Sequence, residues 1–146
     1  MKRYIFKNNN DYNGFMMEVL NSLGGKELDY NWLVTDIETY FLDNDYLFLS
    51  TKELFDLIEK NNDPQWIWGV FSAIPNKYSK EEVLKYDFPF ANNHRDLWKA
   101  AIIQHPLADI EIISYDSSFL TIVSKSDKYI DMLRKTFSSL KEDKDV

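Results

Sequence analysis

Two histidines are the residues of this sequence best suited to acid–base chemistry. His94 lies in the segment Asn92-Asn93-His94-Arg95-Asp96, and His105 precedes a proline. A carboxylate that orients a histidine makes a general base, and Asp96 or Asp116 could do so for His94. However, neither histidine has a second histidine at metal-ligand spacing, and no serine occupies a Gly-x-Ser-x-Gly turn. We therefore expect both to be loop residues. A small ligand-binding domain or enzyme that uses His94 or His105 with a carboxylate is the alternative.

Four carboxylates gather between residues 36 and 45. We expect Asp36 and Glu38 to project from one face of a strand, roughly 7 Å apart at about 3.3 Å per residue, and Asp43 and Asp45 to lie in the adjacent turn. Asp43-Asn44-Asp45 begins like a calcium loop, but it lacks the glycine at the sixth position and the glutamate at the twelfth. We therefore expect no metal and no cofactor here. The simpler interpretation is a solvated acidic edge, and a docking surface for a basic partner is the alternative.

The segment Trp66-Ile67-Trp68 is expected to place two indoles on one strand face. Such a pair could stack on nucleic-acid bases, but the chain has 17 basic and 24 acidic residues and a net charge of −7. A surface of that charge repels phosphate backbones and attracts basic proteins. We therefore expect buried aromatic side chains and no binding of nucleic acid.

Length and composition indicate one domain, residues 1–146, in a reducing compartment. The chain has no cysteine, which excludes disulfides, thiol nucleophiles and thiolate metal sites. Its apolar runs are far shorter than the ~18 residues that a membrane span needs. The basic N-terminus is not followed by an apolar segment of signal-peptide length. We expect a cytoplasmic protein that does not interact with membranes.

The spacing of apolar residues predicts strands at 2–6, 31–42, 46–49 and 65–74, and helices at 11–23, 51–60, 79–86 and 126–140. Ser50 and Ser79 each precede a glutamate by three residues, which is the capping-box spacing that begins a helix. Residues 87–107 are expected to be irregular, and residues 141–146 to form a charged, frayed tail.

Two further strands, Ile110–Tyr115 and Phe119–Ser124, carry apolar residues on both faces and flank a polar turn at 116–118. Strands buried on both faces lie at the centre of a sheet. Along 31–42, simple alternation places Leu33 and Ile37 on one face and Asp36 on the other. The expected fold is α+β: an antiparallel or mixed twisted sheet of five to six strands with three to four helices packed mainly on one face.

Three segments, 68–75, 108–118 and Ser124-Lys125, resemble an uncharacterised family of small acidic Firmicutes proteins with a domain of unknown function. The family is similar to toxin-immunity proteins. The resemblance covers about the second half of the chain and implies no catalytic residues. Together with the acidity of the chain and its lack of catalytic motifs, the resemblance leads us to expect a non-enzymatic protein-binding module. Its expected partner is a basic protein such as a toxin domain.

Overall fold

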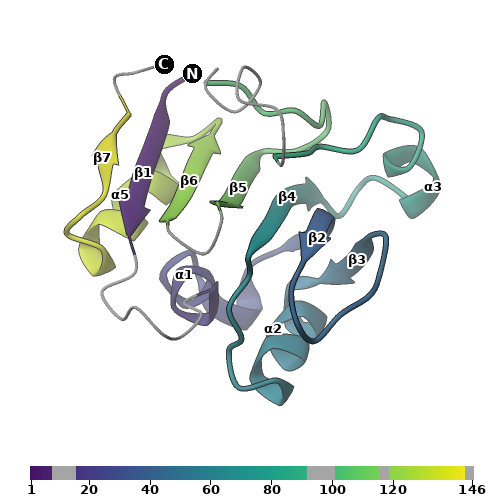
Figure 1. Cartoon of the computed structure of the whole chain (residues 1–146). Coiled ribbons are helices and arrows are strands. Elements are labelled where there is room, and N and C mark those ends of the chain that lie inside the picture. Colours follow the sequence, from purple (N-terminus) through teal and green to yellow (C-terminus); the bar gives the residue numbers. More distant parts are fainter. Residues whose placement is uncertain (8–15, 92–100, 116–118, 144–146) are drawn as a thin grey trace.

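The computed structural model describes residues 1–7, 16–91, 101–115 and 119–143. Within these residues one open, fully antiparallel sheet has the strand order β3-β2-β4-β5-β6-β1-β7 (Figure 1). Its strands are β1 (Arg3–Lys7), β2 (Tyr30–Glu38), β3 (Leu47–Ser50), β4 (Trp68–Pro75), β5 (Ile110–Tyr115), β6 (Phe119–Ser124) and β7 (Lys141–Glu142). The predicted α+β class is confirmed, with seven strands where five to six were expected.

Three helices pack on one face of the sheet, and they form the main hydrophobic core with it. These are α1 (Met16–Ser22), α2 (Thr51–Lys60) and α5 (Asp127–Thr136), with the short 3-10 turn η1 (Gly25–Glu27) after α1. The short helix α3 (Lys80–Val83) packs on the other face, which we call the second face. The expected start of the first helix lies outside the described residues. No helix among the described residues is long and apolar enough to cross a membrane.

Both predicted capping boxes are formed. The Ser50 hydroxyl accepts a hydrogen bond from the Glu53 amide at 3.1 Å, and the Glu53 carboxylate accepts one from the Ser50 amide at 3.0 Å. The same reciprocal pair joins Ser79 and Glu82. Each box satisfies amides that would otherwise lack a partner at the start of a helix.

The central strand is β5, and all six of its side chains are buried. Ile110 and Ile112 face the helices, whereas Ile113 and Tyr115 face the second face. This confirms the prediction that an apolar pattern on both faces marks a central strand. The turn predicted at 116–118 lies outside the described residues.

A β-bulge interrupts β2 and changes which side chains share a face. Asp36 has φ 50°, and the register against β4 shifts between Thr35 and Glu38. Leu33 packs on the second face, but Ile37 packs against the helix-side core. The predicted common face for Leu33 and Ile37 is therefore wrong, because a bulge inserts an extra residue and reverses the alternation beyond it.

The C-terminal segment differs from the expected frayed tail at residues 141–143. Lys141 and Glu142 form β7, which pairs with β1, and the Asp143 amide donates to the Arg3 carbonyl at 2.8 Å. The Arg3 guanidinium, only 3% exposed, donates to the Asp143 carboxylate. This ion pair holds the segment against the first strand. Residues 144–146 lie outside the described part.

Candidate functional site

Residues 38–45, which join β2 to β3 and which we call the acidic loop, present exposed carboxylates. Glu38, Asp43 and Asp45 are all exposed. Tyr40 lies between them in the chain, and its side chain is 89% exposed. The sequence from 27 to 51 contains six acidic residues and no lysine or arginine. The acidic loop therefore combines negative charge with an exposed aromatic ring.

The residues on either side of Tyr40 anchor the acidic loop to the body of the protein. The Thr39 hydroxyl donates a hydrogen bond to the Gln65 carbonyl at 3.0 Å. The Phe41 ring meets the buried Trp66 ring edge-on, with centroids 5.1 Å apart. Both neighbours of Tyr40 are thus fixed against the body of the protein, while the Tyr40 side chain itself stays exposed to solvent.

Asp36 has a different role from the other three predicted site residues. Its carboxylate is half-buried and accepts a hydrogen bond from the Ala91 amide at 2.8 Å. The bulge turns this side chain toward the segment that crosses the second face. Glu38, Asp43 and Asp45 thus share an exposed loop, whereas Asp36 connects β2 to Ala91.

A buried carboxylate, Glu111, lies on the second face of β5 and is 2% exposed. Its Oε1 accepts a hydrogen bond from the Gln104 amide at 3.0 Å. Its Oε2 accepts from the Ser72 hydroxyl at 3.1 Å and from the His105 amide at 3.4 Å. Burial raises the pKa of this carboxyl to about 7, and the three neutral donors oppose the rise. Glu111 could therefore exchange a proton near neutral pH.

Gln104 extends this network to the segment 89–91. Its side-chain oxygen accepts from the Phe90 amide and its side-chain nitrogen donates to the Phe90 carbonyl, both at 2.9 Å. The buried Thr35 hydroxyl donates to the Pro89 carbonyl at 2.7 Å. Together with Asp36, these groups hold 89–91 on the second face. Glu111 is the buried centre of this network and has no exposed surface of note, which indicates a structural role.

Both ring nitrogens of His105 have backbone partners. The side chain is fully buried, and its Nδ1 accepts a hydrogen bond from the Leu107 amide at 3.1 Å. The Nε2 must then carry the proton, which it donates to the Val83 carbonyl at 3.0 Å. Burial lowers the pKa of the ring. His105 is thus neutral, and its ring supports α3 through the hydrogen bond to Val83. The other histidine, His94, lies outside the described residues.

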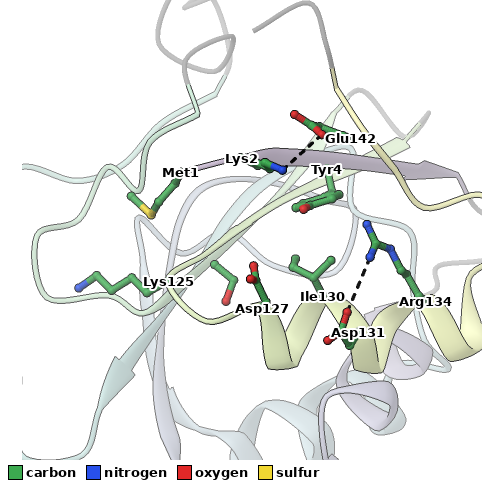
Figure 2. A pocket seen from close by; sticks show the side chains of 10 residues that line it. Met1, Lys2, Tyr4, Lys125, Asp127, Ile130, Asp131, Arg134 and Glu142 are labelled. Atoms are coloured by element: carbon green, nitrogen blue, oxygen red, sulfur yellow. Dashed lines mark ion pairs between the residues drawn. The ribbon is translucent and has the colours of Figure 1, made fainter.

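A surface groove of about 460 Å³ lies between β1 and α5 (Figure 2). It is lined by Met1, Lys2, Tyr4, Ser124, Lys125, Asp127, Ile130, Asp131, Arg134 and Glu142. Lys2 pairs with Glu142 at 3.9 Å and Arg134 with Asp131 at 3.7 Å, all four well exposed. Arg134 also lies over the Tyr4 ring, 5.3 Å from its centroid. Exposed pairs of this kind contribute little energy, and these charges already have partners within the chain.

The two indoles predicted to share a strand face lie on opposite sides of the sheet. Trp66 precedes β4 and is buried in the helix-side core, whereas Trp68 begins β4 and packs on the second face against Tyr115. The prediction of one face is wrong because β4 begins at Trp68, which leaves Trp66 outside the strand alternation. Among the described residues, no cluster of three or more histidine, aspartate or glutamate side chains could hold a metal ion.

Sequence reasoning missed Glu111, Gln104 and Tyr40. One signal could have identified Glu111: it is the only charged residue in the apolar run from Ile110 to Ile113. It also lies directly across from the buried Ser72 of β4, which only the pairing register reveals. Comparisons of the chain with protein-family models, with curated proteins and with solved structures find no match.

Proposed function

We propose that this chain is a non-enzymatic protein-binding module that captures a basic protein on its acidic loop. The observation that carries the proposal is Tyr40, 89% exposed between anchored neighbours and surrounded in the chain by Glu38, Asp43 and Asp45. Tyrosines supply much of the binding energy at protein interfaces because they bury a large, stiff ring with a polar tip. The carboxylates would steer a basic partner toward this ring.

We infer the class of partner from the resemblance of the chain to a family of small acidic proteins, which is in turn similar to toxin-immunity proteins. In this proposal the partner is a basic toxin domain, and the chain neutralises it in the cytoplasm. The net charge of −7 supports this interpretation, since it attracts a basic protein over a distance of about one Debye length.

The alternative is an enzyme or ligand-binding domain that uses His94 or His105 with a carboxylate, and His105 does not support it. Both ring nitrogens of His105 are engaged by backbone groups. The Glu111 carboxylate contacts the His105 amide rather than its ring. An oriented acid–base pair needs a ring nitrogen that can exchange a proton with a bound molecule, and His105 offers none.

The probe in this test is the protein encoded by the neighbouring gene, in a form that includes its most basic domain. Isothermal titration calorimetry at low and at physiological salt compares the wild type with Tyr40→Ala and with the triple variant Glu38→Gln, Asp43→Asn, Asp45→Asn. We expect Tyr40→Ala to weaken binding about thirtyfold, equivalent to about 2 kcal/mol at an interface hot spot. The triple variant should bind more weakly and with a smaller salt dependence.

The matched control removes three carboxylates elsewhere: Asp56→Asn, Glu59→Gln and Asp131→Asn. These side chains are exposed and form only surface ion pairs, with Lys26 or Arg134. We expect the control variant to bind the probe like the wild type. We also expect co-expression of the wild type to protect cells from the toxicity of the neighbouring gene's product. Equal affinity and equal salt dependence for the wild type and the acidic-loop triple variant would refute the proposal.

A further inference from the structure

In the described part of the chain, the β3 edge of the sheet lacks the charges and proline that commonly protect edge strands. The strand β3 has β2 as its neighbour on one side, and the described part of the chain places no strand on its other side. Its sequence, Leu-Phe-Leu-Ser, has no charge and no proline. The opposite edge, β7, is only two residues long, and both are charged and exposed. Short length and charge are the devices that block edge-to-edge pairing, so the two edges differ in their capacity to accept another strand.

The backbone of β3 is held in place by packing on both of its faces. Leu47 and Leu49 pack against the helix-side core, whereas Tyr46 and Phe48 pack on the second face. The Tyr46 ring also contacts Phe88, with centroids 5.3 Å apart. The amides and carbonyls of the outer edge are therefore already spaced for a partner strand, which reduces the entropy lost on binding.

We infer that the outer edge of β3 receives an extended strand of the basic partner, which adds to the sheet by main-chain hydrogen bonds. This inference rests on the proposed function and names the surface that the partner uses. Strand addition to an exposed sheet edge takes affinity from the backbone and specificity from alternate side chains. The partner strand is thus expected to be apolar where it meets β3 and basic where it meets the acidic loop.

Charge selects this occupant over a second copy of the chain. Asp45 precedes β3 by two residues, so its backbone lies within roughly 7 Å of Leu47. Asp43 comes two residues before Asp45 in the chain. A lysine or arginine at the end of an added strand would therefore meet carboxylates. A second copy carries the same net charge of −7 and is repelled. Two lysines also lie near β3. The Lys80 ammonium is 5.6 Å from the Tyr46 ring centroid on the second face, and Lys52 follows the end of β3 by two residues, at the end away from Asp45.

The test uses a capped synthetic peptide of four Lys-Val repeats as the probe. Its binding to the full chain is followed by amide chemical shifts and by hydrogen exchange of Leu47, Phe48 and Leu49. We expect the peptide to shift these amide signals and to slow the exchange of the outward-directed amides. The same peptide with N-methylated backbone amides keeps its charge but cannot donate, and it should bind at least about tenfold more weakly. A four-repeat Glu-Val peptide is the charge control and should not bind.

The outcomes separate this inference from the function on which it rests. If the N-methylated peptide binds equally and shifts only the acidic loop, strand addition is overturned and the acidic-loop proposal stands. The same holds if the neighbouring gene's product binds with the expected salt dependence but leaves exchange at β3 unchanged. Protection of β3 in the absence of peptide, with light scattering at twice the chain mass, would identify a second copy as the occupant and overturn the inference.

Discussion

Replacing Glu111 by glutamine should change how the stability of the protein depends on pH. Burial raises the pKa of this carboxyl from its usual 4.5 to about 7. That difference corresponds to about 3 kcal/mol, because one pKa unit is worth about 1.4 kcal/mol. Between these two pKa values the folded chain binds more protons than the unfolded chain, so the free energy of unfolding falls as the pH rises. The loss is complete just above pH 7.

Glutamine cannot ionise, and it preserves part of the hydrogen-bond network. Its oxygen can still accept from the Gln104 amide, and its amide can donate to the Ser72 hydroxyl. The side-chain NH2 group of the glutamine would also face the His105 backbone amide, which donates to Oε2 of Glu111 at 3.4 Å in the wild type. Two N–H groups that point at each other, with no acceptor between them, lower the free energy of unfolding by about 1–2 kcal/mol at every pH. We therefore expect Glu111→Gln to be more stable than the wild type by about 1–2 kcal/mol near pH 8 and to lose this advantage near pH 5.

Urea unfolding at several pH values between about 5 and 8 measures the effect. The free energy of unfolding of the wild type should fall by about 2.5 kcal/mol relative to the variant across this range. His105 acts in the opposite direction, but it does so in both proteins, and the comparison cancels it. Glu81→Gln, at an exposed position on α3, is the control and should follow the wild type. Parallel pH curves for the wild type and Glu111→Gln would refute the argument that burial raises the pKa of Glu111 in the folded chain.

Three further predictions concern the fold. Ser50→Ala should lower the free energy of unfolding by about 1 kcal/mol, since the Glu53 amide loses its cap; an unchanged urea midpoint would contradict this. Arg3→Met should cost about 3 kcal/mol by removing the guanidinium that donates to the Asp143 carboxylate, and adding Asp143→Leu should recover most of the loss; equal stability of the single and double variants would disprove the coupling. The lowered pKa of His105 predicts stability that is present above its usual pKa of 6.5 and lost as the pH falls below it. His105→Gln should reduce that acid-side loss in urea unfolding, and an unaltered loss would exclude this histidine.

Local sequence signals predicted the elements that depend on neighbours in the chain. The helix start at Ser50 needs only Glu53, three residues away, and both side chains lie where the capping box requires them. The central place of β5 followed from apolar residues on both of its faces. The bulge at Asp36 depends instead on the Ala91 amide, 55 residues further along the chain, and no local pattern reveals it. Likewise, Lys141 and Glu142 become a strand only because β1 supplies a partner.

The candidate site was predictable in its charge but not in its geometry. The exposed positions of Asp43 and Asp45 agree with the turn expected there, and the exposed position of Glu38 agrees with an expected solvated acidic edge. The exposure of Tyr40 could not be predicted, because it results from the anchoring of Thr39 and Phe41 by Gln65 and Trp66. The buried position of Glu111 depends on the pairing of β5 with β4, which brings Ser72 opposite it.

The place of β1 between β6 and β7 has a consequence for biosynthesis. The first strand of the chain pairs only with strands made more than a hundred residues later, such as Arg3 with Val123. A nascent chain that has emerged as far as β5 thus presents a sheet of four strands, and β1 must wait for its partners. Contacts of such large sequence separation slow folding. The N-terminal strand, although it is made first, should therefore remain unprotected during translation until β6 has left the ribosome.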